Sequence, residues 1–178
     1  MMSRYEVANL KTLDGMEGKG FRVTLCRDGR PVACVTDPAT GGPFIFKWRD
    51  RDAIALVKTV DYRNEPHEFL GTVEEADFHA HCIALPKLSG VDNSMWYRRP
   101  DIVISELVGT AQVARRLLRW FKSKVVFIES GKAYTVQIPA GQSAMSIQAH
   151  VNEQRAGAVV LNSLDLQLAV QLAIAAGL

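Results

Sequence analysis

The sequence predicts an α+β protein with an N-terminal antiparallel β-meander, a helical middle and a small C-terminal β-β-α-β-α unit. Alternating apolar residues and tight turns fill the first third of the chain, which is typical of antiparallel strands. Apolar residues at helical spacing dominate the middle, and strand patterns return after residue 122. We expect residues 1–122 to form the sheet with its helices, and residues 123–178 to form a small lobe packed on it as one compact unit.

The first third is expected to form four strands, at about 4–13, 20–27, 31–36 and 44–48. The pair Asp28-Gly29 separates the second strand from the third and suits a two-residue hairpin turn. A uniform register from this turn places Cys34 opposite Val23, on the apolar face of the sheet. Cys26 then points to the other face, so we expect free thiols rather than a disulfide.

The middle third is expected to begin with two helices. The first would start near Asp50, because four apolar residues follow at i, i+3, i+4 and i+7: Ala53, Leu56, Val57 and Val60. Residues 61–71, which include a proline, are then expected to form a loop. Thr72 and Glu75 have the spacing of a capping box, which predicts a second helix at about 73–84.

A third and longer helix is predicted at about 101–122, with an apolar stripe on one side and cations on another. The expected buried stripe is Ile104, Leu107, Val108, Ala111, Ala114, Leu118 and Phe121. The cations and one aromatic residue form a candidate surface for nucleic-acid phosphates or for an acidic protein: Arg98, Arg99, Arg115, Arg119, Trp120 and Lys122. The same pattern also fits a solvated helix face.

The last third is expected to begin with two strands, at about 124–129 and 133–138, followed by a helix at about 142–154. A short strand at about 158–161 and a final helix with its N-cap at Ser163 complete it. From Ala156 to Leu178 the only charged residue is Asp165. Three leucines of the final helix share one side, at i, i+4 spacing: Leu164, Leu168 and Leu172. We expect this side to be buried, either on the strand at 158–161 or against a partner, such as a second copy in a homodimer.

Composition excludes several classes of protein. The 178 residues carry a net charge of only +2, which argues against a DNA mimic and against a generally basic nucleic-acid binder. No apolar run approaches the roughly 20 residues of a membrane-spanning helix, and the polar N-terminus does not resemble a signal peptide. We therefore expect a cytoplasmic protein with reduced cysteines.

The sequence contains one cluster of residues that could bind a metal. Three histidines and a cysteine lie within sixteen residues: His67, His79, His81 and Cys82. A helix at 73–84 would place His79 and His81 on opposite sides, which weakens a metal-dependent hydrolase at His67, His79 and Cys82. No nucleophile motif accompanies them, so we expect neither metal nor cofactor, and no enzyme activity.

A family resemblance adds a biological context. The glycine-rich pattern Gly15-Met16-Glu17-Gly18-x-Gly20-Phe21 is followed by Asp28-Gly29, Asp37, Gly41-Gly42 and Phe46. This pattern resembles a group of small uncharacterised proteins encoded by tailed phages and prophages, and the similarity continues through residues 121–127 and 160–162. The resemblance implies genomic context only, and no catalytic residue follows from it.

By analogy with accessory phage proteins of this size, we expect a non-catalytic interaction protein in the cytoplasm of the bacterial host. It would bind and inhibit or redirect a host protein or nucleoprotein complex, with anti-defence (anti-CRISPR) activity as one such role. The alternative is a nucleic-acid-binding phage accessory protein that uses the cations of the third helix. A metal-dependent hydrolase is the third and least favoured interpretation.

Overall fold

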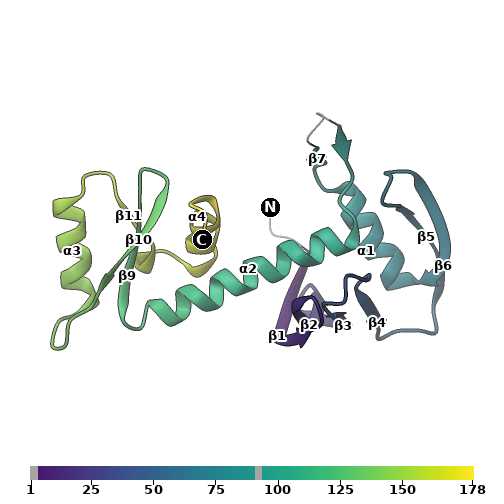
Figure 1. The fold of residues 1–178 in the computed structure, drawn as a ribbon, viewed down its shortest axis with the longest axis horizontal. Coiled ribbons are helices and arrows are strands. Elements are labelled where there is room, and N and C mark those ends of the chain that lie inside the picture. Colours follow the sequence, from purple (N-terminus) through teal and green to yellow (C-terminus); the bar gives the residue numbers. More distant parts are fainter. Residues whose placement is uncertain (1–3, 91–93) are drawn as a thin grey trace. The chain divides into compact units, whose positions relative to one another are not determined.

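Four antiparallel strands form the predicted meander and pair in the order β1-β2-β3-β4 (Figure 1). The structure is a computed structural model and describes residues 4–90 and 94–178. The strands are β1 (Tyr5–Gly15), β2 (Gly18–Arg27), β3 (Arg30–Asp37) and β4 (Ile45–Trp48). Asp28 and Gly29 both have positive φ, at 50° and 76°, which a tight turn between twisted strands requires. The α+β class and the meander are confirmed.

A shift in register between Leu25 and Cys26 corrects the predicted position of Cys34. Cys34 pairs with Thr24 and is half-buried, while Ala33 and Val35 occupy the buried positions. The uniform register was wrong because an extra residue in one strand reverses the facing of every residue beyond it. The cysteines are free thiols, as expected.

Residues 54–72 form a second hairpin, which corrects the predicted helix and loop. Its strands β5 (Ile54–Val60) and β6 (Pro66–Thr72) pair along their whole length. The turn is closed by Asp61, whose Oδ1 accepts hydrogen bonds from the backbone N–H groups of Arg63 and Glu65. Pro66 takes the first strand position, where a missing N–H is tolerated.

Helix α1 (Val73–Ala84) begins at the predicted capping box, which is confirmed. The Thr72 hydroxyl accepts from the Glu75 N–H at 3.1 Å, and the Glu75 carboxylate accepts from the Thr72 N–H at 3.4 Å. The helix packs on β5 and buries Phe78 and Cys82. The Phe78 ring lies 4.9 Å from that of Tyr5, so the helix and the meander share one core.

A short hairpin, β7 (Leu88–Ser89) with β8 (Met95–Trp96), precedes the long helix α2 (Pro100–Trp120). The chain divides into two compact units within α2, one ending at Val108 and the other running from Gly109 to Leu178. The buried positions of α2 shift at this point, from Ile104 and Val108 to Val113 and Leu117. Each half therefore packs on the core of its own unit.

This change in the buried positions of α2 corrects the C-terminal end of the predicted apolar stripe. Leu118 is 50% exposed, and the adjacent Leu117 is buried in its place. A stripe extrapolated from the first half of the helix could not anticipate this, because the step from Val108 to Val113 is longer than one helical turn.

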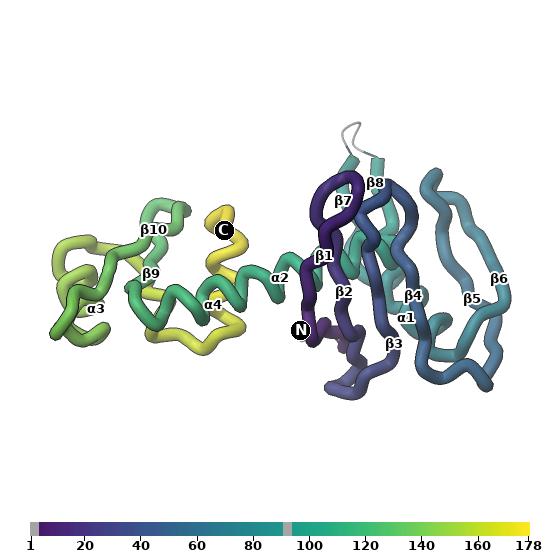
Figure 2. The backbone as a smooth tube through the Cα atoms, turned by 60° about the horizontal axis from the view of Figure 1, so that its bottom comes forward, coloured from purple at the N-terminus to yellow at the C-terminus, as the bar shows by residue number. Residues whose placement is uncertain are grey.

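The second unit has the predicted order of two strands, a helix, a strand and a helix (Figure 1). Its elements are β9 (Lys124–Glu129), β10 (Lys132–Gln137), α3 (Ala144–Gln154), β11 (Val159–Val160), a 3-10 turn (Leu161–Ser163) and α4 (Leu166–Ala175). Figure 2 traces the path of its backbone from β9 to α4. The central strand β9 packs apolar residues on two sides, in separate clusters around Val126 and around Phe127. The strand order is β10-β9-β11.

Helix α4 starts later than predicted and buries different residues. Its N-cap is Asp165, whose Oδ1 accepts from the Leu168 N–H at 3.0 Å, whereas the Ser163 hydroxyl donates to the Val160 carbonyl. The fully buried side is made of small residues: Ala169, Val170 and Ala173. Leu168 is 41% exposed, so its expected burial within this unit is wrong and the alternative of a partner surface stays a prediction, while Leu164 and Leu172 are half-buried against this core.

Among the described residues, no helix is both long and apolar enough to cross a membrane.

Candidate functional site

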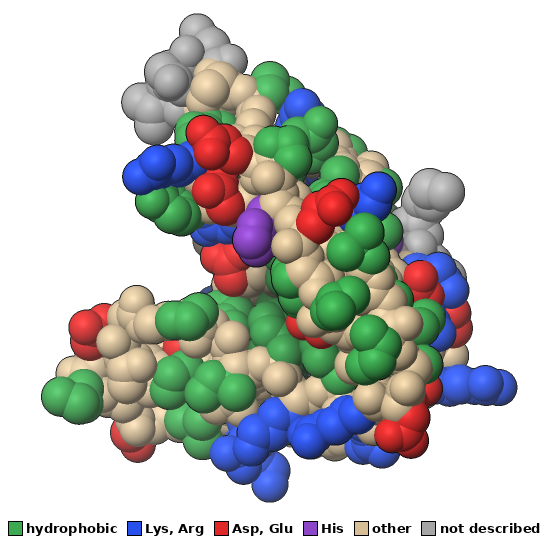
Figure 3. Space-filling model, turned by 90° about the vertical axis from the view of Figure 1, so that its right-hand side faces the viewer, with side chains coloured by type: hydrophobic (Ala, Val, Ile, Leu, Met, Phe, Trp, Pro, Cys, Tyr) green, Lys and Arg blue, Asp and Glu red, His purple; other side chains and the backbone are tan. Residues whose placement is uncertain are grey.

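The first unit contains an open pocket of about 420 Å³. It lies where the loop before β4 and β4 itself meet α1 and the start of α2, and Figure 3 shows this side of the unit hollowed. Its size is within the range of ordinary small-molecule sites. Residues from three distant parts of the sequence line it: Gly42, Pro43, Phe44, Phe46, His79, Arg99, Pro100 and Asp101.

One wall of the pocket is apolar and is held in place by the core. The Phe44 ring meets Phe21 edge to face, with centroids 5.2 Å apart. The Phe46 ring stacks on Trp48 at 5.7 Å, and Trp48 is buried. Aromatic pairs of this kind fix ring orientation, so the wall is preorganised.

The polar part of the lining carries an arginine and a carboxylate bound to each other. Arg99 donates from Nε and Nη2 to the two carboxylate oxygens of Asp101, at 3.1 and 3.0 Å. This two-bond pairing with Asp101 is the main reason that the pKa of Arg99 is raised. Asp101 lies in the first turn of α2, where the helix dipole favours a negative charge. The two charges neutralise each other at the edge of the pocket.

His79 on α1 completes the lining and is held neutral. Burial lowers its pKa to about 4, and its ring meets Phe69 edge to face at 5.7 Å. Its Nδ1 is buried with no hydrogen-bond partner among the described residues. The imidazole is therefore uncharged at neutral pH and is a weak base.

The structure does not assemble the histidines and cysteine into a metal site. His67 is exposed on β6 and stacks on Phe69, whereas Cys82 is buried in the core. Within residues 4–90 and 94–178, no group of three or more His, Cys, Asp or Glu side chains could hold a metal ion. Burial also raises the pKa of the Cys82 thiol, which keeps it protonated and poorly nucleophilic.

The outer face of the β5–β6 hairpin is apolar and exposed. Leu56 and Leu70 are directly opposite each other and are 50% and 76% exposed, and the neighbouring Ile54 is 63% exposed. The ion pair of Lys58 with Glu68, at 3.6 Å, lies beside them on the same face. Figure 3 views the unit from the side of this hairpin and shows apolar side chains gathered over it. Sequence reasoning missed this surface because it assigned the segment to a helix and a loop.

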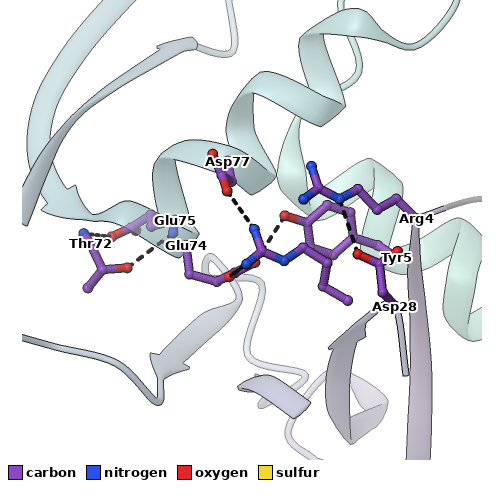
Figure 4. A network of polar contacts seen from close by, with 8 residues as sticks. Arg4, Tyr5, Asp28, Thr72, Glu74, Glu75 and Asp77 are labelled. Carbon is purple, nitrogen blue, oxygen red and sulfur yellow. Dashed lines mark hydrogen bonds and ion pairs between the residues drawn. The ribbon is translucent and has the colours of Figure 1, made fainter. Parts of the chain in front are cut away.

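A polar network ties α1 to the meander (Figure 4). Arg27 on β2 contacts the Glu74 carboxylate at 2.8 Å and also pairs with Asp77. The Tyr5 hydroxyl donates to Glu74 at 3.0 Å. Because these groups satisfy one another, the network positions α1, and with it His79, rather than forming an open site.

The predicted cationic surface is divided between the two units. Arg98 is paired with Glu106 and Arg99 with Asp101, and these residues belong to the first unit. Their charges are largely satisfied by neighbouring carboxylates that the sequence analysis did not assign to them.

The rest of the cationic surface lies at the end of α2, in the second unit. Its cations occupy exposed positions: Arg115, Arg119 and Lys122. Trp120 is half-buried against the core, and Arg116 and Lys124 lie over its ring at 5.9 and 5.5 Å. These contacts reduce the part of Trp120 that could stack on a base.

Comparisons of the chain with protein-family models, with curated proteins and with solved structures find no match.

Proposed function

We propose that the chain is a non-catalytic interaction protein that binds a protein partner through the outer face of the β5–β6 hairpin. The observation that carries this proposal is the exposed trio of Ile54, Leu56 and Leu70 on one side of a two-stranded sheet. Contiguous exposed apolar side chains favour a binding surface, and burying each leucine contributes about 1.5–3 kcal/mol.

The chemistry of this face indicates the kind of partner. A complementary surface would have an apolar centre that covers the two leucines and a pair of opposite charges that meets Lys58 and Glu68. The hairpin pairs with no third strand among the described residues, so an extended segment of the partner could also add to its edge.

The protonation states of His79 in the pocket and of Cys82 in the core support a non-catalytic role. His79 is a weak base, and the Cys82 thiol stays protonated. Arg99 and Asp101 are committed to each other. Neither His79 nor Cys82 has a pKa shifted toward neutral pH, as general acid–base catalysis favours.

The resemblance to phage-encoded proteins supports a partner in the bacterial host. In this proposal the chain inhibits or redirects a host protein or nucleoprotein complex, and an anti-defence role falls within that class.

The test begins by purifying the full chain together with a host partner and identifying that partner. The complex is then reconstituted from the two separately purified proteins. Replacing Leu70 with Ser should weaken the reconstituted complex about tenfold or more, because it removes an apolar contact at the centre of the face. The matched control is Met16→Ser, which changes an apolar residue of the same unit that is 93% exposed. Equal affinity of the two variants, or a doubled mass of the chain alone that Leu70→Ser abolishes, would contradict the proposal.

A second candidate function is nucleic-acid binding by the exposed cations at the end of α2. It predicts an affinity that falls steeply with salt, because each neutralised phosphate releases a counterion. Replacing Arg115 and Arg119 together with Glu should abolish a gel shift seen at low salt. A gel shift that survives this double replacement, or none at low salt, would exclude this function for the helix.

A further inference from the structure

We propose that the pocket lined by Phe44, Phe46, Arg99 and Asp101 binds a nucleobase. This inference concerns a different surface from the outer face of the β5–β6 hairpin and does not depend on the proposed function.

The apolar wall suits a flat ring. Phe44 and Phe46 line the pocket, and their own ring contacts hold both in place. Aromatic side chains offer stacking surfaces for bases. Gly42, which also lines the pocket, has no side chain to fill it.

The polar edge offers donors and acceptors side by side. Arg99 uses Nε and Nη2 on Asp101 and keeps further N–H groups, while each Asp101 oxygen keeps a lone pair. A guanidinium–carboxylate pair held by two parallel bonds is planar. It therefore matches a ligand edge that carries an acceptor next to a donor, as the edges of nucleobases do.

The charge of the site selects against simple ions. Arg99 and Asp101 cancel, and the burial that lowers the pKa of His79 to about 4 leaves that ring neutral. A phosphate or a metal cation would find no excess of opposite charge. A neutral heteroaromatic ring can instead exchange water for stacking and hydrogen bonds.

The experiment titrates the full-length chain with adenosine, guanosine, cytidine and uridine, and separately with inorganic phosphate, by calorimetry and by amide NMR shifts. We expect saturable binding of at least one nucleoside and none of phosphate. Arg99→Gln should weaken binding about tenfold or more, the effect of losing a charge-assisted hydrogen bond. Arg98→Gln is the matched control, because Arg98 is the adjacent arginine, is also ion-paired, and does not line the pocket.

A short single-stranded oligonucleotide and its abasic counterpart distinguish a base within a nucleic acid from a free nucleoside. Binding of the intact strand alone, with the same loss in Arg99→Gln, would assign the pocket to a base in a strand. Equal binding of the abasic strand, competition by phosphate, no binding of any base-containing probe, or equal effects of the two arginine variants would each overturn the proposal. If Arg99→Gln lowers the thermal midpoint, Asp101→Asn tests the same edge.

Discussion

Tyr5, on the first strand, donates its hydroxyl hydrogen bond to the carboxylate of Glu74, on the first helix, at 3.0 Å. The tyrosine side chain is fully buried, and the same carboxylate also receives Arg27. Burial and the nearby Glu74 raise the pKa of Tyr5, so the phenol stays neutral and keeps the proton that it donates to Glu74. This bond joins the meander to the helix that carries His79.

Replacing Tyr5 with Phe should therefore destabilise the first unit. The variant keeps the ring against Phe78 but removes a hydrogen bond to a charged group, which costs about 1.5–3 kcal/mol. Urea unfolding measures the change, and Tyr62→Phe is the control, because Tyr62 is exposed. Equal stability of the two variants would show that the buried bond contributes nothing net.

The neutral His79 predicts an acid-sensitive fold. Its pKa is about 4 when folded, against 6.5 for an unperturbed histidine, and the cause is burial. The unfolded chain therefore binds a proton first as the pH falls. The free energy of unfolding therefore keeps its full value above pH 6.5 and falls on acidification toward pH 4. The loss due to His79 is about 1–2 kcal/mol between pH 7 and 5.

Replacing His79 with Gln should flatten the dependence of unfolding free energy on pH between 7 and 5. The same change at His150, which is exposed, should leave that slope as it is in the original chain. His81 also has a pKa lowered by burial and then by Arg4, so a smaller slope of the same sign should remain. An unchanged slope in His79→Gln would contradict this account of the burial.

Two adjacent leucines of α2 should respond very differently to truncation. Leu117 is fully buried, and its loss should cost about 2–5 kcal/mol. Leu118 is half-exposed, and Leu118→Ala should cost less than about 1 kcal/mol. Thermal unfolding of the two variants compares them directly. A larger loss in Leu118→Ala would support the apolar stripe that the sequence predicts.

The final helix offers a similar contrast between stability and association. Leu168→Asp should lower the thermal midpoint far less than a change in the buried cluster, because this side chain is 41% exposed. Ala169→Asp places a charge in the buried cluster and should unfold the second unit. Light scattering of Leu168→Asp then tests the predicted homodimer, since a lower mass at an unchanged midpoint would assign this face to a second copy. A large fall in the midpoint would contradict the exposure of Leu168.

Local signals in the sequence predicted local structure well. Asp28-Gly29 correctly predicted a turn, and Thr72 with Glu75 correctly predicted the start of a helix. Both structures depend only on hydrogen bonds and backbone angles of neighbouring residues. The segment 53–60 failed because its apolar residues fit a helix as well as a half-buried strand. Only the pairing with β6, set by tertiary structure, decides between the two.

The candidate sites were harder to predict for a related reason. The pocket joins residues near 44, 79 and 100, and no motif links them. The charge of Arg99 can be read from the sequence, but its ion pair with Asp101 cannot, and this pairing changes what the arginine side chain can bind. The histidines and cysteine lie close together in the sequence, but among the described residues they form no group that could hold a metal ion.

The two halves of α2 rest on different cores, although they form one uninterrupted helix. The amide hydrogens of a helix exchange with solvent only when their hydrogen bonds open. The rate of exchange therefore depends on the stability of the unit that must unfold to open them. Amide hydrogen exchange along α2 should therefore show two levels of protection, one on each side of the change between Val108 and Val113. Opening of the second unit would release only the later amides, so this single helix would report the stability of both units separately.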